Sequence, residues 1–205
     1  MSKKIVVLIS GSGTNLQALI DAERQGQLGG NIALVVSNKK NAYGLARAAE
    51  ASIPASVKTL KEYKDAGKSR EDFDRDLAEL IDEKQRPDLV VLAGFMHILS
   101  PAFFSRFGGR IINLHPALPG ELDGAHAIDR AYSEFLAGKR TKTGVMVHFV
   151  IPEVDKGQPI LTQDVPCVQG DSLEDLENRI HAVEHQILPK AVKLVLDENI
   201  YAKAI

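Results

Sequence analysis

Short apolar runs alternate with segments of helical periodicity over the first 114 residues. The run at residues 5–9 is apolar at every position, which predicts a strand buried on both faces. Further strands are predicted at residues 32–36, 53–57 (an edge strand carrying Pro54), 88–93 and 110–114. Helices are predicted between them, at residues 15–23, 42–51, 69–84 and from Ser100-Pro101 onwards. This alternation is typical of an α/β fold with a doubly wound, mostly parallel sheet.

The pattern changes after Leu114. Two β runs at residues 143–150 and 160–165, joined through a turn at Lys156-Gly157, predict an antiparallel hairpin at the sheet edge. A long C-terminal helix is predicted after the cap at Asp171-Ser172, and Pro189 is expected to kink or interrupt it. We therefore expect one domain over residues 1–205, with two functional halves, 1–112 and 113–205.

Composition excludes several classes of protein. Apolar residues make up 44% of the chain and charged residues 25%, which is ordinary for a globular protein and excludes a disordered one. The net charge is −2 and tryptophan is absent, so we expect no nucleic-acid partner. The single Cys167 forms no internal disulfide and fits a reducing compartment. The first apolar run is too short for a signal peptide or a membrane helix, so we expect a cytoplasmic protein without membrane contact.

A glycine-containing loop, Gly11-Ser12-Gly13-Thr14-Asn15, lies between the first strand and the first helix. A helix N-terminus presents free N–H groups, so this loop predicts a phosphate cradle. The dinucleotide pattern fails because Leu16 stands where its third glycine belongs, and no acidic residue follows the second strand. A monophosphate ligand fits better than NAD or ATP. The alternative is a strand-to-helix turn that simply needs glycine.

Polar residues that suit an oxyanion follow a strand near the sheet centre. Strand alternation points Asn113 and His115 to the same side, where an amide and an imidazole can both donate hydrogen bonds. A carboxylate from Asp155 beside His115 would raise the imidazole pKa and hold the ring protonated. The alternatives are structural: an Asn-x-His-Pro turn, and a turn aspartate before Lys156-Gly157.

A metal-binding motif is present on the last helix. The residues from His181 to His185 match H-x-x-E-H, but no third ligand follows them, so we expect no metal. A polar contact from Glu184 to a substrate is the favoured interpretation.

Five segments together resemble the phosphoribosylglycinamide formyltransferase family, in order and over nearly the whole chain. They are KIVVLISGSGTNLQALIDA, SREDFDRDLAEL, PDLVVLAGFMHILSP, INLHPALPG and VHFVIPEVDKGQPI. The stretch LPGELDG after His115 is similar to the fungal, single-function form of the family. His97 departs from the many relatives that have arginine at this position.

The resemblance implies transfer of a formyl group from 10-formyltetrahydrofolate, as co-substrate, to the amine of glycinamide ribonucleotide in de novo purine synthesis. It assigns catalysis to Asn113, His115 and Asp155, and ribonucleotide binding to Gly13, Thr14, Asn15 and Glu184. It places the folate along Met96, His97, Ile98, Leu99, Asn113 and the loop 151–155, with Arg70 reaching the donor. Residues 1–112 then form the phosphate- and ribonucleotide-binding half, and residues 113–205 the catalytic and folate-binding half.

Other functions stay open from the sequence. They are hydrolysis of the same folate, formylation of initiator methionyl-tRNA, a non-enzymatic sensor of a phosphorylated ligand, and an NAD oxidoreductase. The oligomeric state, monomer or homodimer, is also open.

Overall fold

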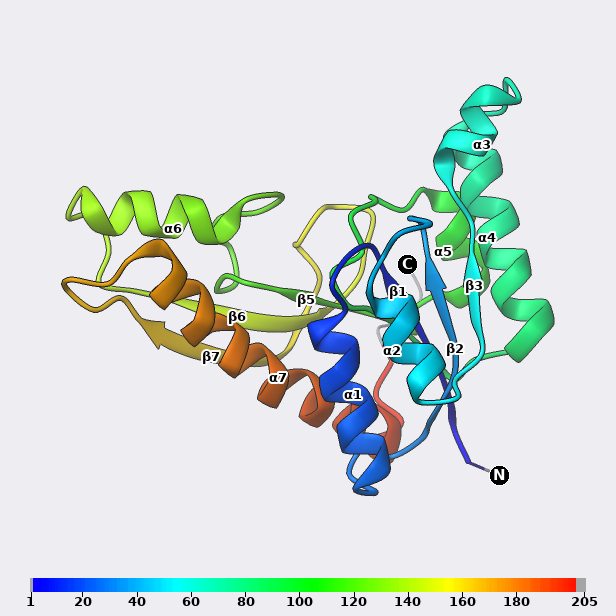
Figure 1. The fold of residues 1–205 in the computed structure, drawn as a ribbon, viewed down its shortest axis with the longest axis horizontal. Coiled ribbons are helices and arrows are strands. Elements are labelled where there is room, and N and C mark those ends of the chain that lie inside the picture. The colour runs from blue at the N-terminus through cyan, green and yellow to red at the C-terminus, as the bar shows by residue number, and fades with distance from the viewer. Residues whose placement is uncertain (1, 202–205) are drawn as a thin grey trace.

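A seven-stranded sheet organises the chain in the computed structural model, which describes residues 2–201 (Figure 1). Its order is β3-β2-β1-β4-β5-β6-β7. The strands are β1 (Lys4–Ile9), β2 (Asn31–Ser37), β3 (Ala55–Val57), β4 (Leu89–Leu92), β5 (Ile111–His115), β6 (Lys142–Phe149) and β7 (Pro159–Pro166). The first five pair in parallel, while β6 and β7 pair antiparallel at one edge. The predicted fold class is confirmed, including the edge hairpin.

The helices are α1 (Thr14–Arg24), α2 (Gly44–Glu50), α3 (Leu60–Asp65), α4 (Arg70–Gln85), α5 (Pro101–Phe107), α6 (Ala127–Leu136) and α7 (Leu173–Glu198). Helices α4 and α7 both begin with a capping box, from Ser69 with Asp72 and from Ser172 with Asp175. Each box satisfies backbone N–H groups that have no partner inside the helix, which explains the predicted starts.

Two helices were not predicted from the sequence. Helix α3 has only six residues, and its apolar side chains Leu60 and Tyr63 are only partly buried against the core. Helix α6 is amphipathic, but His126 at its N-cap has a left-handed backbone and makes no side-chain cap. Helix α6 therefore lacks the start signal that marks α4 and α7, whereas α3 follows the Thr59-x-x-Glu62 pattern, a start signal that sequence reasoning missed.

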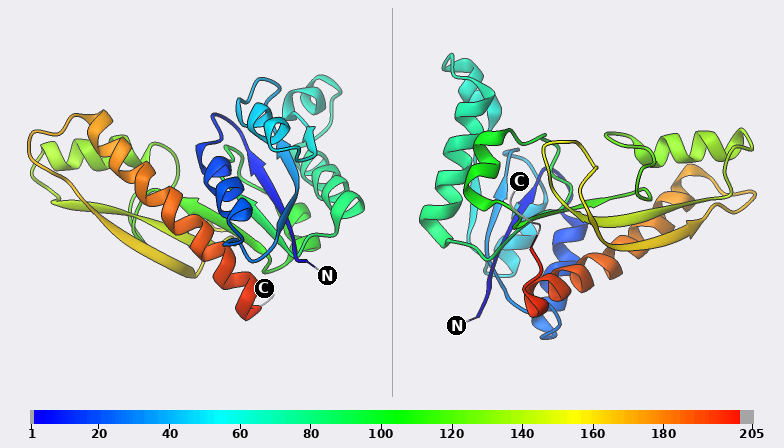
Figure 2. Two further views of the ribbon diagram at one scale, coloured as in Figure 1. Left: turned by 60° about the horizontal axis from the view of Figure 1, so that its bottom comes forward. Right: turned by 180° about the vertical axis from the view of Figure 1, so that it is seen from behind.

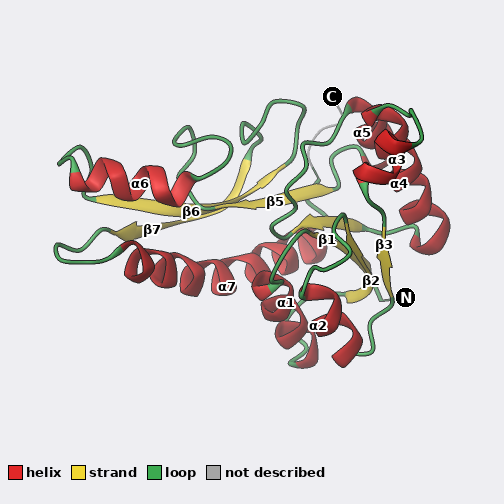
Figure 3. Cartoon of the chain, turned by 45° about the horizontal axis from the view of Figure 1, so that its top comes forward, coloured by secondary structure: helices red, strands yellow, loops and turns green. Residues whose placement is uncertain are grey.

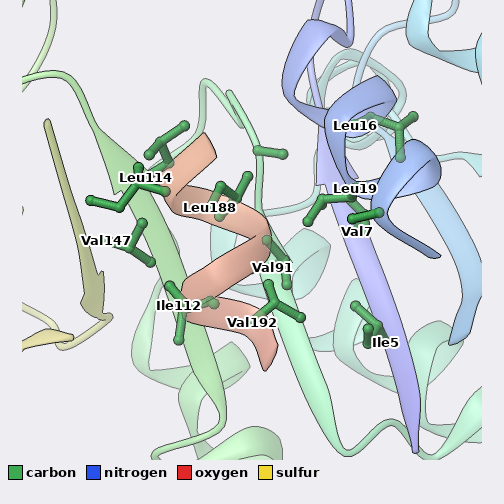
Figure 4. Close-up of a cluster of buried hydrophobic side chains, with 14 of the residues drawn as sticks. Ile5, Val7, Leu16, Leu19, Val91, Ile112, Leu114, Val147, Leu188 and Val192 are labelled. Carbon is green, nitrogen blue, oxygen red and sulfur yellow. The ribbon is translucent and has the colours of Figure 1, made fainter. Parts of the chain in front are cut away.

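The sheet buries apolar side chains on both faces. Helices α1 and α7 cover one face, where Leu188 and Val192 of α7 pack against β-strand residues such as Ile112 and Val91 (Figure 4). Helices α4 and α5 cover the other face with Phe73 and Phe103. Since side chains alternate along a strand, Ile112 and Leu114 face α7, and Asn113 and His115 point to the opposite side.

The β6–β7 hairpin extends away from the parallel strands (Figure 2). Helix α7 runs along one side of the hairpin and α6 lies on the other side (Figure 3). Strand β7, at the end of the sheet order, begins and ends with a proline, Pro159 and Pro166. None of the helices within residues 2–201 has the length and apolar character needed to cross a membrane.

Of the kink or interruption expected at Pro189, the interruption is not observed, because α7 is one helix from Leu173 to Glu198. Proline removes one backbone hydrogen bond from a helix. Pro189 is itself buried, and its neighbours Leu188 and Val192 are fully buried against the sheet. This packing holds the helix together across the missing bond.

Candidate active site

Asn113, His115 and His148 project from the same face of the sheet. Asn113 on β5 pairs directly across from His148 on β6, and His115 follows two residues later on β5. The Asn113 amide nitrogen lies 3.2 Å from Nε2 of His148. The Phe149 carbonyl accepts a hydrogen bond from Nδ1 of His148, at 2.8 Å. The sheet register therefore assembles three polar side chains at one place.

Asp155 joins this group from the loop between β6 and β7. Its Oδ2 lies 3.4 Å from Nδ1 of His115. Its Oδ1 lies 3.4 Å from the Asn113 amide nitrogen and 3.5 Å from Nε2 of His148. The backbone N–H of Gly124 donates to Oδ2 at 2.8 Å. The structure thus brings together the three predicted catalytic side chains, which come from positions 113, 115 and 155.

The Asp155 carboxylate is ionised in this setting. Burial acts to raise the pKa of Asp155, but hydrogen bonds from His148 and Gly124 outweigh it and hold the pKa below its usual value. Asp155 has a left-handed backbone, φ 55°, in the turn that directs its side chain toward the sheet. The ionised acid can only accept hydrogen bonds, so it favours a proton on the facing nitrogen of His115.

His115 differs from the expectation about its charge. Burial lowers the pKa of His115 below its usual value, although the Asp155 charge acts in the predicted upward direction. The resting imidazole is therefore neutral at pH 7, and the sequence-based expectation of a protonated ring is wrong. With its proton on Nδ1 toward Asp155, Nε2 carries a free lone pair. This buried Nε2 has no hydrogen-bond partner among residues 2–201.

His148 is the site residue that sequence reasoning missed. It is 1% exposed and contacts both Asn113 and Asp155. Within a β run, a histidine among apolar residues is the available signal. To assign His148 to the site from this signal, one must also know the register between β5 and β6, which the sequence does not specify.

The predicted phosphate loop adopts a conformation that needs glycine. Gly13 has φ 70°, and a Cβ atom there would lie 2.6 Å from Cα of Gly44 on α2. Gly13 is the N-cap of α1, so the first N–H groups of the helix, from Thr14 and Asn15, point out of its end. Arg47 donates from Nε to the Ser12 carbonyl at 2.9 Å and fixes the loop from α2. This geometry suits an anion.

Glu184 on α7 contacts this loop. The Asn15 amide donates to Oε2 of Glu184 at 3.1 Å. Burial raises the pKa of Glu184, and the bond from Asn15 only partly opposes the effect. The predicted ribonucleotide-binding residues Asn15 and Glu184 are thus in direct contact, although they are far apart in the sequence. Residues 2–201 contain no cluster of three or more histidine, cysteine or acidic side chains that could hold a metal.

The predicted folate segment follows β4 and divides into two kinds of residue. Met96 and Ile98 are exposed, at 75% and 56%, and offer apolar surface to a ligand. Leu99 is only 6% exposed and belongs to the core with Phe73 and Phe103. The Met96 backbone N–H donates to the Ser10 hydroxyl at 2.7 Å, so this segment is tied to the loop that follows β1.

His97 and Arg70 are placed by α4. The His97 Nε2 lies 2.6 Å from Oδ1 of Asp74, which is fully buried and also accepts from the Ser100 N–H at 2.8 Å. Arg70 is exposed at the first position of α4, one turn before Asp74. His97 is therefore a structural anchor as well as a predicted folate contact.

Comparison with known proteins places this geometry in a family. A sequence model described as formyl transferase matches residues 3–192. The chain is 52% identical to phosphoribosylglycinamide formyltransferase of Schizosaccharomyces pombe, over 97% of this chain and 100% of the relative. The chain belongs to the formyl transferase family. This result confirms the resemblance found in the sequence.

Other formyl transferases support the same conclusion. Phosphoribosylglycinamide formyltransferase of Dictyostelium discoideum is 46% identical, covering 95% of this chain and 98% of the relative. The crystal structure of glycinamide ribonucleotide transformylase 1 from Symbiobacterium toebii superposes with a TM-score of 0.90 at 40% identity, covering 98% of this chain and 91% of that chain. The formyl transferase fold is thus shared across both chains.

Proposed function

We propose that this chain transfers the formyl group of 10-formyltetrahydrofolate to the amine of glycinamide ribonucleotide, giving formylglycinamide ribonucleotide in de novo purine synthesis. The observation that carries the proposal is the convergence of Asn113, His115 and Asp155 in a chain 52% identical to a phosphoribosylglycinamide formyltransferase. The fold has its candidate phosphate loop and its apolar Met96–Ile98 surface after neighbouring strands, β1 and β4. Ligands in such sheets bind beyond the carboxyl ends of the strands.

The neutral His115 suits the first step, which forms a C–N bond. The amine nitrogen attacks the formyl carbon, and the carbonyl electron pair moves to oxygen as an oxyanion. His115 accepts the proton of the attacking nitrogen at Nε2, and the ionised Asp155 stabilises the imidazolium that results. The imidazolium then donates a hydrogen bond to the oxyanion. A single donor of this kind contributes about 3 kcal/mol to transition-state stabilisation.

Collapse of the tetrahedral intermediate breaks the C–N bond to the folate. The electron pair of the oxyanion reforms the carbonyl, and the proton held by His115 passes to the departing folate nitrogen. Asn113 contacts His148 and Asp155 through its amide nitrogen, so it donates to the oxyanion only when one of these contacts is exchanged. Formation of the oxyanion hydrogen bond by Asn113 therefore changes its contacts with His148 or Asp155.

The remaining assignments follow the same arrangement. We propose that the loop of Gly13, Thr14 and Asn15 binds the phosphate, and that Glu184 binds the ribose through its Asn15-linked carboxyl group. The exposed Met96 and Ile98 provide an apolar surface for the pterin, and Arg70 pairs with a carboxylate of the folate. The division at residue 112 thus separates the phosphate loop from the catalytic side chains, but both halves contribute to both binding sites, because Glu184 lies in 113–205 and Arg70, Met96 and Ile98 lie in 1–112.

Formyl transfer by the purified chain tests the proposed function. We expect glycinamide ribonucleotide to be formylated as 10-formyltetrahydrofolate is consumed, and His115→Ala to lower kcat by about 1,000-fold with an unchanged far-ultraviolet circular dichroism spectrum. Consumption of the folate at the same rate without the amine, with release of formate, would instead indicate a hydrolase. Near-normal turnover by His115→Ala contradicts the mechanism.

A further inference from the structure

Two loops meet directly beside the candidate catalytic carboxylate. Residues 120–126 follow β5, and residues 150–157 lie between β6 and β7. Gly124 donates its N–H to Asp155, and the neighbouring residue Asp123 forms an ion pair with Lys156. Two adjacent residues of one loop thus contact two adjacent residues of the other. We call this pair of contacts the loop clasp.

The 120–126 loop is fixed independently of Asp155. Glu121 accepts a hydrogen bond at 2.9 Å from Arg140, whose side chain is 13% exposed. Leu122 is buried in a small apolar cluster formed by Ala117, Leu122, Ala127 and Ala131. Arg130 on α6 donates at 2.8 Å to the Asp123 carbonyl, directly before Gly124. Contacts with Arg140, the apolar cluster and Arg130 therefore hold the 120–126 loop in place without Asp155.

The loop backbone also has few alternative conformations. Gly120, Leu122, Gly124 and His126 all have positive φ values, at 81°, 50°, 83° and 58°. Leu122 and His126 are not glycine, so their left-handed backbone persists only because surrounding contacts impose it. A backbone constrained in this way presents the Gly124 N–H in a fixed direction.

The Asp155 carboxylate depends on that direction. The bond from Gly124 to Oδ2, at 2.8 Å, is the shortest contact of the carboxylate, compared with 3.4 Å to His115 and 3.4 Å to Asn113. The terminal torsion of an aspartate is soft, so without this bond the two oxygens have no fixed assignment. With it, Oδ2 faces His115 and Oδ1 faces Asn113 and His148.

We propose that Asp123 and Lys156 are positioning residues, whose ion pair holds the two loops together so that Gly124 orients Asp155 toward His115. The inference rests on the proposed function and adds residues to it that do not touch the substrate. Asp123 and Lys156 are 32% and 50% exposed, so their pair contributes little to overall stability. Their effect is expected in turnover, because a small displacement of a catalytic group costs a large factor in rate.

Charge-reversal variants test the clasp by steady-state kinetics of the full chain. We expect Asp123→Lys and Lys156→Asp each to lower kcat about tenfold, and the double reversal to recover most of the loss. The matched control is Lys142 with Asp164, an exposed pair 2.6 Å apart on β6 and β7. The same reversals there leave kcat unchanged.

The acid limb of the pH profile separates positioning from simple electrostatics. The charged and titratable groups that act on His115 are Asp155, His148 and Asp123, and Lys156 pairs with Asp123. Loss of the Lys156 cation in Lys156→Met would by itself move the limb to higher pH. Withdrawal of the Asp155 carboxylate removes an anion and moves the limb to lower pH, which is the result we expect.

Three results decide the inference. Lys156→Met with wild-type kcat and a limb that is unmoved or higher overturns it, and so does a double reversal that recovers nothing. The neutral variants Asp123→Asn and Lys156→Met keep the test valid if a charge reversal unfolds the chain. Absence of formyl transfer by the wild-type chain contradicts the proposed function itself, whereas normal wild-type turnover with undiminished variants contradicts only the clasp.

Discussion

The half-buried carboxyl group of Asp155 and the buried one of Glu184 have pKa values shifted in opposite directions, because their hydrogen-bond partners differ. Asp155 receives hydrogen bonds from His148 and the Gly124 N–H, and these hold its pKa down despite burial. Glu184 has a single amide donor, Asn15, so burial dominates and its pKa is raised. One carboxyl group is thereby kept as an anion beside His115, and the other tends to hold its proton.

The pH dependence of turnover reports the charge of His115. Since neutral His115 accepts the proton, kcat/KM falls as pH drops through its pKa, which burial sets below about 6.5. Asp155→Asn removes an anion that raises this pKa, so we expect the acid limb to move to lower pH and the plateau to fall by about 100-fold or more. Rate profiles between pH 5 and 9 measure both effects. A limb that moves to higher pH is inconsistent with this account.

We expect Glu184→Gln to weaken binding of glycinamide ribonucleotide and to raise the thermal stability of the protein. A carboxyl group whose folded pKa is raised loses stability as pH rises above its unfolded pKa of about 4.3, because the ionised form is disfavoured when buried. The uncharged glutamine avoids this loss, so we expect a higher Tm than wild type at pH 8 and a difference that shrinks toward pH 4. The KM for glycinamide ribonucleotide should rise.

Thermal unfolding followed by circular dichroism measures the effect of Glu184→Gln. Glu83→Gln on α4 is the control, since Glu83 is exposed and its replacement should leave Tm unchanged at either pH. Equal shifts for the two variants would contradict the role of burial.

Strand alternation was enough to place Asn113 and His115 on one side, and this prediction is confirmed by the contacts of both residues with Asp155. The sequence could not show that Asp155 would reach them, because the turn at 150–157 depends on Gly124 from another loop. It also could not show that burial of His115 outweighs the charge of Asp155. Both effects arise from tertiary packing, which local sequence does not specify.

At the scale of elements, a buried polar pair connects α4 to the segment that follows β4. Asp74 is fully buried and accepts from His97 and from the Ser100 N–H at the start of α5. Burial acts to raise the pKa of Asp74, but these partners outweigh it and lower the pKa. The exposed Met96 and Ile98 are therefore held on either side of an anchored residue.

Removal of this anchor should destabilise the protein. We expect His97→Ala to lower the free energy of unfolding by about 3 kcal/mol, because it leaves a buried carboxylate with one partner fewer. Urea denaturation measures the loss, and Asp74→Asn combined with His97→Ala should recover part of it. Lys61→Ala, which breaks an exposed ion pair with Asp65, should change stability by less than about 1 kcal/mol. A similar small change for His97→Ala would refute the anchoring role.

Local signals decided most of which elements were predictable, and the short helix α3 is the exception. The capping boxes of Ser69 and Ser172 mark helix starts that agree with the structure. Helix α6 starts without a side-chain cap at His126, so its formation depends on neighbouring elements. Helix α3 does begin at a Thr59-x-x-Glu62 pattern, but it has only six residues and none of them is fully buried. Pro189 shows the same override, since packing of α7 preserves a helix that local propensity would break.

For the whole molecule, the largest apolar core joins the two functional halves. It includes Ile5 and Val7 from β1, Val145 and Val147 from β6, and residues of α7 up to Leu196. Within residues 113–201, the one separate apolar cluster is much smaller than this core. It contains only Ala117, Leu122, Ala127 and Ala131. We therefore propose that the halves 1–112 and 113–205 are parts of one domain. Its oligomeric state and cytoplasmic location stay predictions.

A shared core predicts one cooperative transition. We expect calorimetric and van't Hoff enthalpies of unfolding to agree, and the fragment 1–112 to lack a cooperative transition because it loses the cover of α7. Circular dichroism and calorimetry suit this test, since the chain has no tryptophan for fluorescence. Two separate transitions, or an independently folded fragment, would show that the halves are distinct domains.

The prolines that bound β7 have a consequence for aggregation. A terminal strand exposes backbone groups that a strand from another molecule can extend, which is the geometry of cross-β fibrils. Pro159 and Pro166 supply no N–H at either end of this edge, and the charged Asp164 lies between them on the exposed strand. The β7 edge of the sheet is thus protected against pairing with strands of other molecules, although no further strand covers it.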